Sequence, residues 1–112
     1  MSAIQNYNDV GFEHYHDNYI PDALELVLQA YGGDSLSWNE LRVYHNRLTG
    51  EMAYGRASGC SCDNWETRFH SFSNLTKFDW NTFMVQLREV TGLDAADRVE
   101  HVATVAKFME NR

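Results

Sequence analysis

The stretch that decides the fold runs from Asn39 to Cys62, and from Glu40 onward it reads ELRVYHNRLTGEMAYGRASGCSC. Residues 38–46 and 51–58 have the alternation and aromatic content of strands, and residues 45–50 supply a turn between them. Gly50 provides the positive φ that such a turn uses. The pattern predicts an antiparallel hairpin whose second strand leads into both cysteines of the chain, Cys60 and Cys62.

A third strand for this sheet is expected at residues 23–31, where apolar and polar side chains alternate. On this interpretation one buried face would carry Leu24, Leu26, Leu28 and Ala30. The same segment also fits a helical stripe, with Pro21 near its first turn and Gly32 at its end. We expect the strand, because an isolated hairpin is only marginally stable in water.

The C-terminal part changes to a helical period. One apolar face consists of Trp80, Phe83, Met84, Leu87 and Val90. Thr76 and Asp79 have the spacing of a capping box. Asp94 is expected to cap a second helix. The apolar face predicted for that helix consists of Val99, Val102, Ala103, Ala106 and Met109.

These elements predict an α+β fold in one domain that spans residues 1–112. A small antiparallel sheet of three or four strands occupies residues 20–62 and packs against two C-terminal helices within residues 75–112. The apolar face of Trp80, Phe83 and Leu87 is expected to lie on the sheet. Residues 1–19 form a loosely ordered aromatic arm, with 11–16 as a candidate edge strand, and residues 63–74 are irregular.

The charge of the chain disfavours direct nucleic-acid binding. Nine Lys and Arg residues stand against sixteen Asp and Glu residues, which gives a formal net charge of −7. The basic residues are spread along the chain, whereas phosphate binding needs them clustered. No apolar run approaches the roughly 18 residues of a membrane span. The N-terminal residues lack the pattern of a secretory signal, so we expect a cytoplasmic protein.

The cysteines Cys60 and Cys62 are the candidate site for chemistry. A disulfide between them would close a very small, strained ring, so free thiols are expected. As zinc ligands they would supply two of about four donors, and the others would come from His14, His16 or His70. One CxC pair is not a zinc motif, and we therefore expect structural thiols with no metal and no cofactor. The alternative is a small metal- or thiol-dependent enzyme centred on this pair.

Aromatic side chains outside the predicted strands and helices suggest a protein interface. They lie in the N-terminal arm and in the irregular segment, where they would offer an apolar patch to a partner protein or to a second copy of the chain. The candidate binding residues are Tyr15, Tyr19, Trp65, Phe69 and Phe72.

The run from Leu24 to Trp65 resembles a family of small uncharacterised actinobacteriophage proteins. The resemblance is carried by Val43-Tyr44, Thr49-Gly50 and Tyr54, by the motif Ser58-Gly59-Cys60-Ser61-Cys62, and by the aromatic Trp65 that follows. The resemblance implies a phage accessory protein that acts in the bacterial cytoplasm. It implies no particular activity for the residues of this chain. We therefore expect a non-enzymatic protein that binds a host or phage protein, with a minor virion component as a further alternative.

Overall fold

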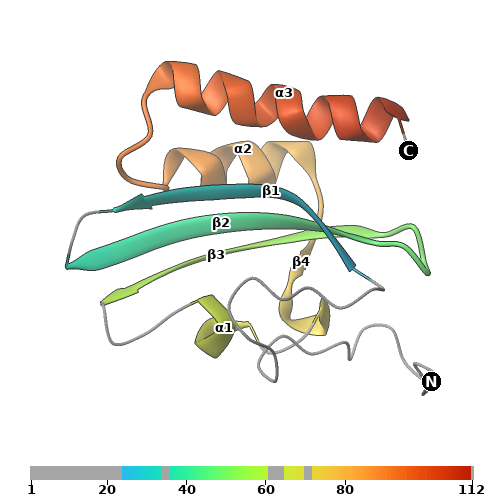
Figure 1. Ribbon diagram of the computed structural model, residues 1–112, viewed down its shortest axis with the longest axis horizontal. Coiled ribbons are helices and arrows are strands. Elements are labelled where there is room, and N and C mark those ends of the chain that lie inside the picture. The colour runs from blue at the N-terminus through green and yellow to red at the C-terminus, as the bar shows by residue number, and fades with distance from the viewer. Residues whose placement is uncertain (1–23, 34–35, 61–64, 70–71, 112) are drawn as a thin grey trace.

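The computed structural model describes residues 24–33, 36–60, 65–69 and 72–111, and these residues form the α+β fold that the sequence predicts. Four antiparallel strands make one sheet in the order β1-β2-β3-β4. Helices α2 and α3 lie together on one face of this sheet, and the short helix α1 lies on the opposite face (Figure 1). The strands are β1 (Leu24–Gly33), β2 (Ser37–Asn46), β3 (Met52–Cys60) and β4 (Thr76–Lys77). The helices are α1 (Trp65–Arg68), the 3₁₀ helix η2 (Phe72–Asn74), α2 (Trp80–Arg88) and α3 (Ala95–Asn111).

Strand β1 settles the choice between strand and helix for residues 23–31. It pairs with β2 along its length, from Leu24 opposite Asn46 to Gly33 opposite Trp38. The prediction of one buried face was wrong, because the register shifts between Leu26 and Leu28. A bulge exchanges the faces of a strand, since side chains alternate with a period of two. Leu24 therefore packs on the α1 side of the sheet and Leu28 on the α2 side.

The β2–β3 hairpin was predicted correctly, including its turn. Strand pairing runs from Ser37 opposite Cys60 to His45 opposite Met52. The side-chain oxygen of the buried Asn46 accepts a hydrogen bond from the backbone N–H of Leu48 at 2.9 Å. Gly50 adopts a φ of 80°, as expected for a turn that favours glycine.

The strand β4 was not predicted from the sequence. Thr76 and Lys77 pair with Tyr54 and Ala53 of β3, so the sheet extends into the segment that was predicted to be helical. Thr76 is consequently a strand residue and does not cap a helix. The N-cap of α2 is Asp79, whose carboxylate accepts a hydrogen bond from the Thr82 N–H at 3.0 Å. The candidate edge strand at 11–16 lies outside the described residues.

Hydrophobic clusters lie on both faces of the sheet. On the helical face, Phe83 and Leu87 are fully buried and Trp80 packs at the edge of the cluster, which confirms the predicted contact of α2 with the sheet. Other buried members of this cluster are Leu28, Ala30, Leu41, Val43, Met52, Tyr54, Val90 and Val105. The opposite cluster contains Leu24, Trp38, Tyr44, Ala53, Ala57, Trp65 and Phe72. None of the described helices combines the length and apolar character that a bilayer crossing requires.

The buried side of helix α3 overlaps the predicted one only in part, since Val102 and Met109 pack on the core but Val99 does not. Val105 is fully buried, and Val102, Phe108 and Met109 pack against the same cluster. Val99, which the sequence pattern assigned to the buried face, has 69% of its surface exposed. The outward side of α3 therefore carries an apolar residue next to α2.

Candidate functional site

The predicted thiol site is different in the structure, because Cys60 is disulfide-bonded. The expectation of a free thiol at the end of β3 was therefore wrong. The Cys60 carbonyl oxygen accepts a hydrogen bond from the Trp38 indole N–H at 3.0 Å, which fixes the end of the strand. In this oxidation state Cys60 offers neither a nucleophile nor a thiolate ligand.

The proposed metal ligands are not brought together within the described part of the chain. Cys62, His14, His16 and His70 lie outside the described residues. Among the residues that the structure does describe, no three His, Cys, Asp or Glu side chains are grouped as metal ligands would be. The metal hypothesis therefore gains no geometric support from these residues.

The predicted binding aromatics that the structure describes belong to the core. Trp65 is 1% exposed and Phe72 is 4% exposed, and Phe69 packs on the same cluster. The Trp65 and Phe69 rings have centroids 4.6 Å apart, and the Trp65 and Tyr44 rings have centroids 5.6 Å apart. In this structure the rings of Trp65 and Phe72 fill the face of the sheet. Tyr15 and Tyr19 lie outside the described residues.

A buried charged group lies on this same face, where sequence reasoning placed nothing. The Arg42 guanidinium sits 4.6 Å from the Trp65 ring centroid and donates hydrogen bonds to the Glu40 carboxylate and the Tyr44 hydroxyl. Gln29 donates to the same carboxylate at 2.7 Å. Burial opposes the charge of Arg42, but the charges and hydrogen bonds of Tyr44 and Glu40 outweigh it and raise the pKa of the guanidinium. The pairing stabilises Arg42 as a fixed positive charge. Because a guanidinium is not deprotonated in proteins, Arg42 does not act as a general acid.

The alternation of Glu40, Arg42 and Tyr44 along β2 is the signal that could have revealed this group. Residues two apart on a strand share a face, so opposite charges with this spacing can pair.

A second polar network fastens the end of α2 to the sheet. Arg56 on β3 donates to the Gln86 side-chain oxygen at 2.7 Å and to the Asn39 side-chain oxygen at 3.3 Å. The Asn39 amide in turn donates to the Glu89 carbonyl oxygen at 2.8 Å. These bonds satisfy a carbonyl at the helix C-terminus and fix where α2 ends. Their role is to position α2.

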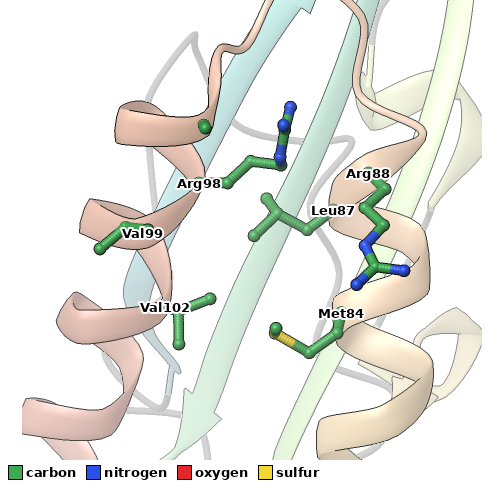
Figure 2. A pocket seen from close by; sticks show the side chains of 7 residues that line it. Met84, Leu87, Arg88, Arg98, Val99 and Val102 are labelled. Carbon is green, nitrogen blue, oxygen red and sulfur yellow. The ribbon is translucent and has the colours of Figure 1, made fainter.

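A groove between α2 and α3, with a volume of about 370 Å³, is a surface feature of the described residues that can bind a ligand. Met84, Leu87 and Val102 project into the space between the two helices (Figure 2). The full lining consists of Met84, Leu87, Arg88, Ala95, Arg98, Val99 and Val102. We call this feature the α2–α3 groove.

The α2–α3 groove lies among exposed apolar side chains. Val99 of the lining is 69% exposed and Met84 is 37% exposed. Single exposed apolar residues are ordinary on protein surfaces, but a group of them around a groove is typical of a binding site. Arg88 and Arg98 are the charged residues of the lining.

None of the residues lining the α2–α3 groove was predicted as a binding residue. The sequence pattern placed Val99 on the buried face of a helix, and Leu87 of the lining is indeed a core residue. The groove depends on how α3 is rotated and how far it stands from α2, and periodicity reports neither quantity.

Comparisons with known proteins add no assignment to this geometry. No protein-family model matches the chain, and neither a curated protein nor a solved structure matches it.

Proposed function

We propose that this chain is a non-enzymatic, phage-encoded accessory protein that binds a host or phage protein in the bacterial cytoplasm through the α2–α3 groove. The observation that carries the proposal is the exposure of Met84 and Val99 in the lining of an open groove. Leaving such side chains in water forgoes about 25 cal/mol for each Å² that a partner could cover. A partner that covered them would gain this free energy.

The phage origin and the cytoplasmic location rest on the resemblance carried by the Ser58–Cys62 motif and on the composition of the chain. The α2–α3 groove supports the binding role independently of that resemblance. The thiol-enzyme alternative is less well supported, because Cys60 is disulfide-bonded.

The groove is also built to persist without its partner. Its floor includes Leu87, which is 1% exposed and belongs to the core, so the lining is anchored to the sheet. A preformed surface loses little conformational entropy on binding, which favours affinity.

The test compares three forms of the chain in affinity capture from a bacterial host lysate: wild type, Val99→Asp and Leu48→Asp. Both substitutions place a carboxylate at an exposed apolar position, but Leu48 lies in the β2–β3 turn and not in the groove lining. The captured protein is then purified, and its affinity for each form is measured by calorimetry.

We expect wild type and Leu48→Asp to bind the purified partner alike, and Val99→Asp to bind it at least about tenfold more weakly. Equal binding by all three forms would remove the α2–α3 groove from the proposal. Failure of wild type to retain any protein specifically would contradict the binding function itself.

A further inference from the structure

The disulfide at Cys60 lies at an exposed end of the sheet. Cys60 is the last residue of β3 and stands opposite Ser37 at the start of β2 (Figure 1). Both residues are exposed, so this end of the strand pair is open to small molecules in solution. The chain contains one other cysteine, Cys62, and a disulfide within the chain therefore joins Cys60 to Cys62 across the single residue Ser61.

A ring closed across one residue is strained. Residues two apart in an extended strand have Cα atoms about 6.6 Å apart, whereas most disulfides hold theirs about 5.5–6 Å apart. Closing the bond therefore requires the backbone to leave the extended form directly after β3. Cys60 itself is held in place, because its carbonyl oxygen accepts a hydrogen bond from the indole N–H of the buried Trp38 at 3.0 Å. Strain of this kind makes a disulfide easier to reduce.

Strain and exposure together favour exchange with thiols. Relaxed, buried disulfides are structural, whereas strained or exposed ones are the labile ones. The sulfur of a bonded Cys60 is the electrophile and the incoming thiolate is the nucleophile, so the reaction needs no general base beside Cys60. Disulfides that form in a cytoplasm are mostly transient, which agrees with a bond that opens readily.

We propose that Cys60 is a reversible thiol-exchange site, which takes a low-molecular-weight thiol as a mixed disulfide. The thiolate of the small thiol attacks the Sγ atom of Cys60. The bond between Cys60 and Cys62 breaks, a bond between Cys60 and the small thiol forms, and Cys62 leaves as a thiolate that takes a proton from water. A second thiol then attacks the sulfur of the bound one. This step releases the small-molecule disulfide and leaves both cysteines reduced, so two thiols give two electrons to the chain.

The strain also determines how long the mixed disulfide lasts. In a relaxed dithiol site the second cysteine expels the bound thiol, because closing the ring costs little. Here the return attack by Cys62 has to restore the strained ring, so the form that carries the small thiol on Cys60 is populated. Cys60 is thus a modification site that reacts stoichiometrically, which is compatible with a non-enzymatic protein. The inference does not depend on the α2–α3 groove.

The experiment measures the exchange equilibrium of the full chain, purified without reductant. The probe is 2-mercaptoethanol, which is neutral and is therefore neither attracted nor repelled by the net charge of −7. The chain is equilibrated with this thiol and its disulfide at increasing ratios of thiol to disulfide, and exchange is stopped with acid. Intact mass and peptide mapping then report the oxidised, mixed and reduced forms. We expect the mixed disulfide on Cys60 to become populated as the ratio rises.

The matched control widens the ring and keeps both cysteines. Two glycines inserted between Ser61 and Cys62 relieve the strain without altering β3 or the Trp38 hydrogen bond. We expect the equilibrium constant for opening the disulfide to fall at least about tenfold in this variant, with less mixed disulfide at every ratio. Circular dichroism reports whether the variant is folded.

Several results would overturn the inference. Equal equilibrium constants for the wild type and the widened variant would show that strain does not drive the exchange. Reduction without an adduct on Cys60, an adduct on Cys62 alone, or two free thiols in protein purified without reductant would each contradict an exchange site at Cys60. None of these results bears on the Val99→Asp comparison, which tests the proposed function separately.

Discussion

Replacing Gly32 by alanine tests the contact that fixes the connection between α2 and α3. Gly32 lies near the end of β1, directly under the segment that joins these helices. A Cβ atom built on Gly32 would stand 1.9 Å from the backbone oxygen of Thr91 and 3.1 Å from a methyl carbon of Val90. The same Thr91 oxygen accepts a hydrogen bond from the Gly33 N–H at 3.0 Å. Alanine can therefore be accommodated only if the connecting segment moves away from the sheet.

The size of the effect follows from these contacts. Overpacking in a closely packed site costs about 1–3 kcal/mol, and loss of the bond between Gly33 and Thr91 adds about 1 kcal/mol. We expect Gly32→Ala to lower the free energy of unfolding by about 3 kcal/mol. Domains are stable by about 5–15 kcal/mol, so this is a large fraction of the total. The corresponding fall in Tm is roughly 10 °C for a domain of this size.

Two other glycines give matched comparisons in the same assay. A Cβ on Gly55 would meet the Phe69 ring at 2.7 Å and a Leu75 methyl carbon at 2.9 Å. Side chains can shift to other rotamers more readily than the backbone oxygen that faces Gly32, so Gly55→Ala should cost less than Gly32→Ala. Gly50 has a φ of 80° and no heavy atom within 4 Å of its built Cβ, so Gly50→Ala should cost only the left-handed strain of about 1 kcal/mol. The free energies are measured by urea unfolding followed by circular dichroism. The reasoning is refuted if Gly32→Ala is no more destabilising than Gly50→Ala.

Further predictions concern the start of α2 and the end of β3. Asp79→Ala should lower the free energy of unfolding by about 1 kcal/mol, because the Thr82 N–H loses its acceptor. Asp79→Asn should keep most of the stability, since its amide oxygen can still accept this bond. Equal losses for the two variants in urea unfolding would contradict the capping role of Asp79. Iodoacetamide added to the native protein should leave Cys60 unmodified until a reductant is present, because a disulfide sulfur is not alkylated. The labelling is measured by mass spectrometry. Labelled Cys60 in the absence of reductant would contradict the disulfide.

The sequence predicted the sheet well because its strands carry strong local signals. Turn residues bound the hairpin, and Gly50 has the positive φ that its position predicts. The face of β1 was predicted less well, because a one-residue bulge near Val27 leaves no distinctive residue type in the sequence. The bulge arises from how β1 fits a sheet that has a hydrophobic cluster on each side, which is a tertiary constraint.

The orientation of α3 and the candidate site could not be predicted for a related reason. Val99 and Val102 belong to one apolar stripe of α3, and Val105 and Phe108 belong to an overlapping one, so periodicity alone does not select the buried side. In the structure Val105 turns toward the sheet and Val99 toward solvent. Similarly, the sequence alone suggested an interface role for Trp65, because the core that buries this residue forms only when the chain folds.

The end of the α2–α3 groove next to the connection between the helices is held by several independent interactions. The last turn of α2 is tied to the sheet through Asn39, whose amide donates to the Glu89 carbonyl oxygen. The start of α3 is closed by reciprocal hydrogen bonds between Asp94 and Asp97, at 2.8 Å and 3.2 Å. Since the segment between these helices also rests on β1, the backbone that carries Arg88 and Arg98 is fixed before any partner arrives. Most of the ordering cost of binding then falls on the partner, which is the condition under which a groove of only two helical turns can bind specifically.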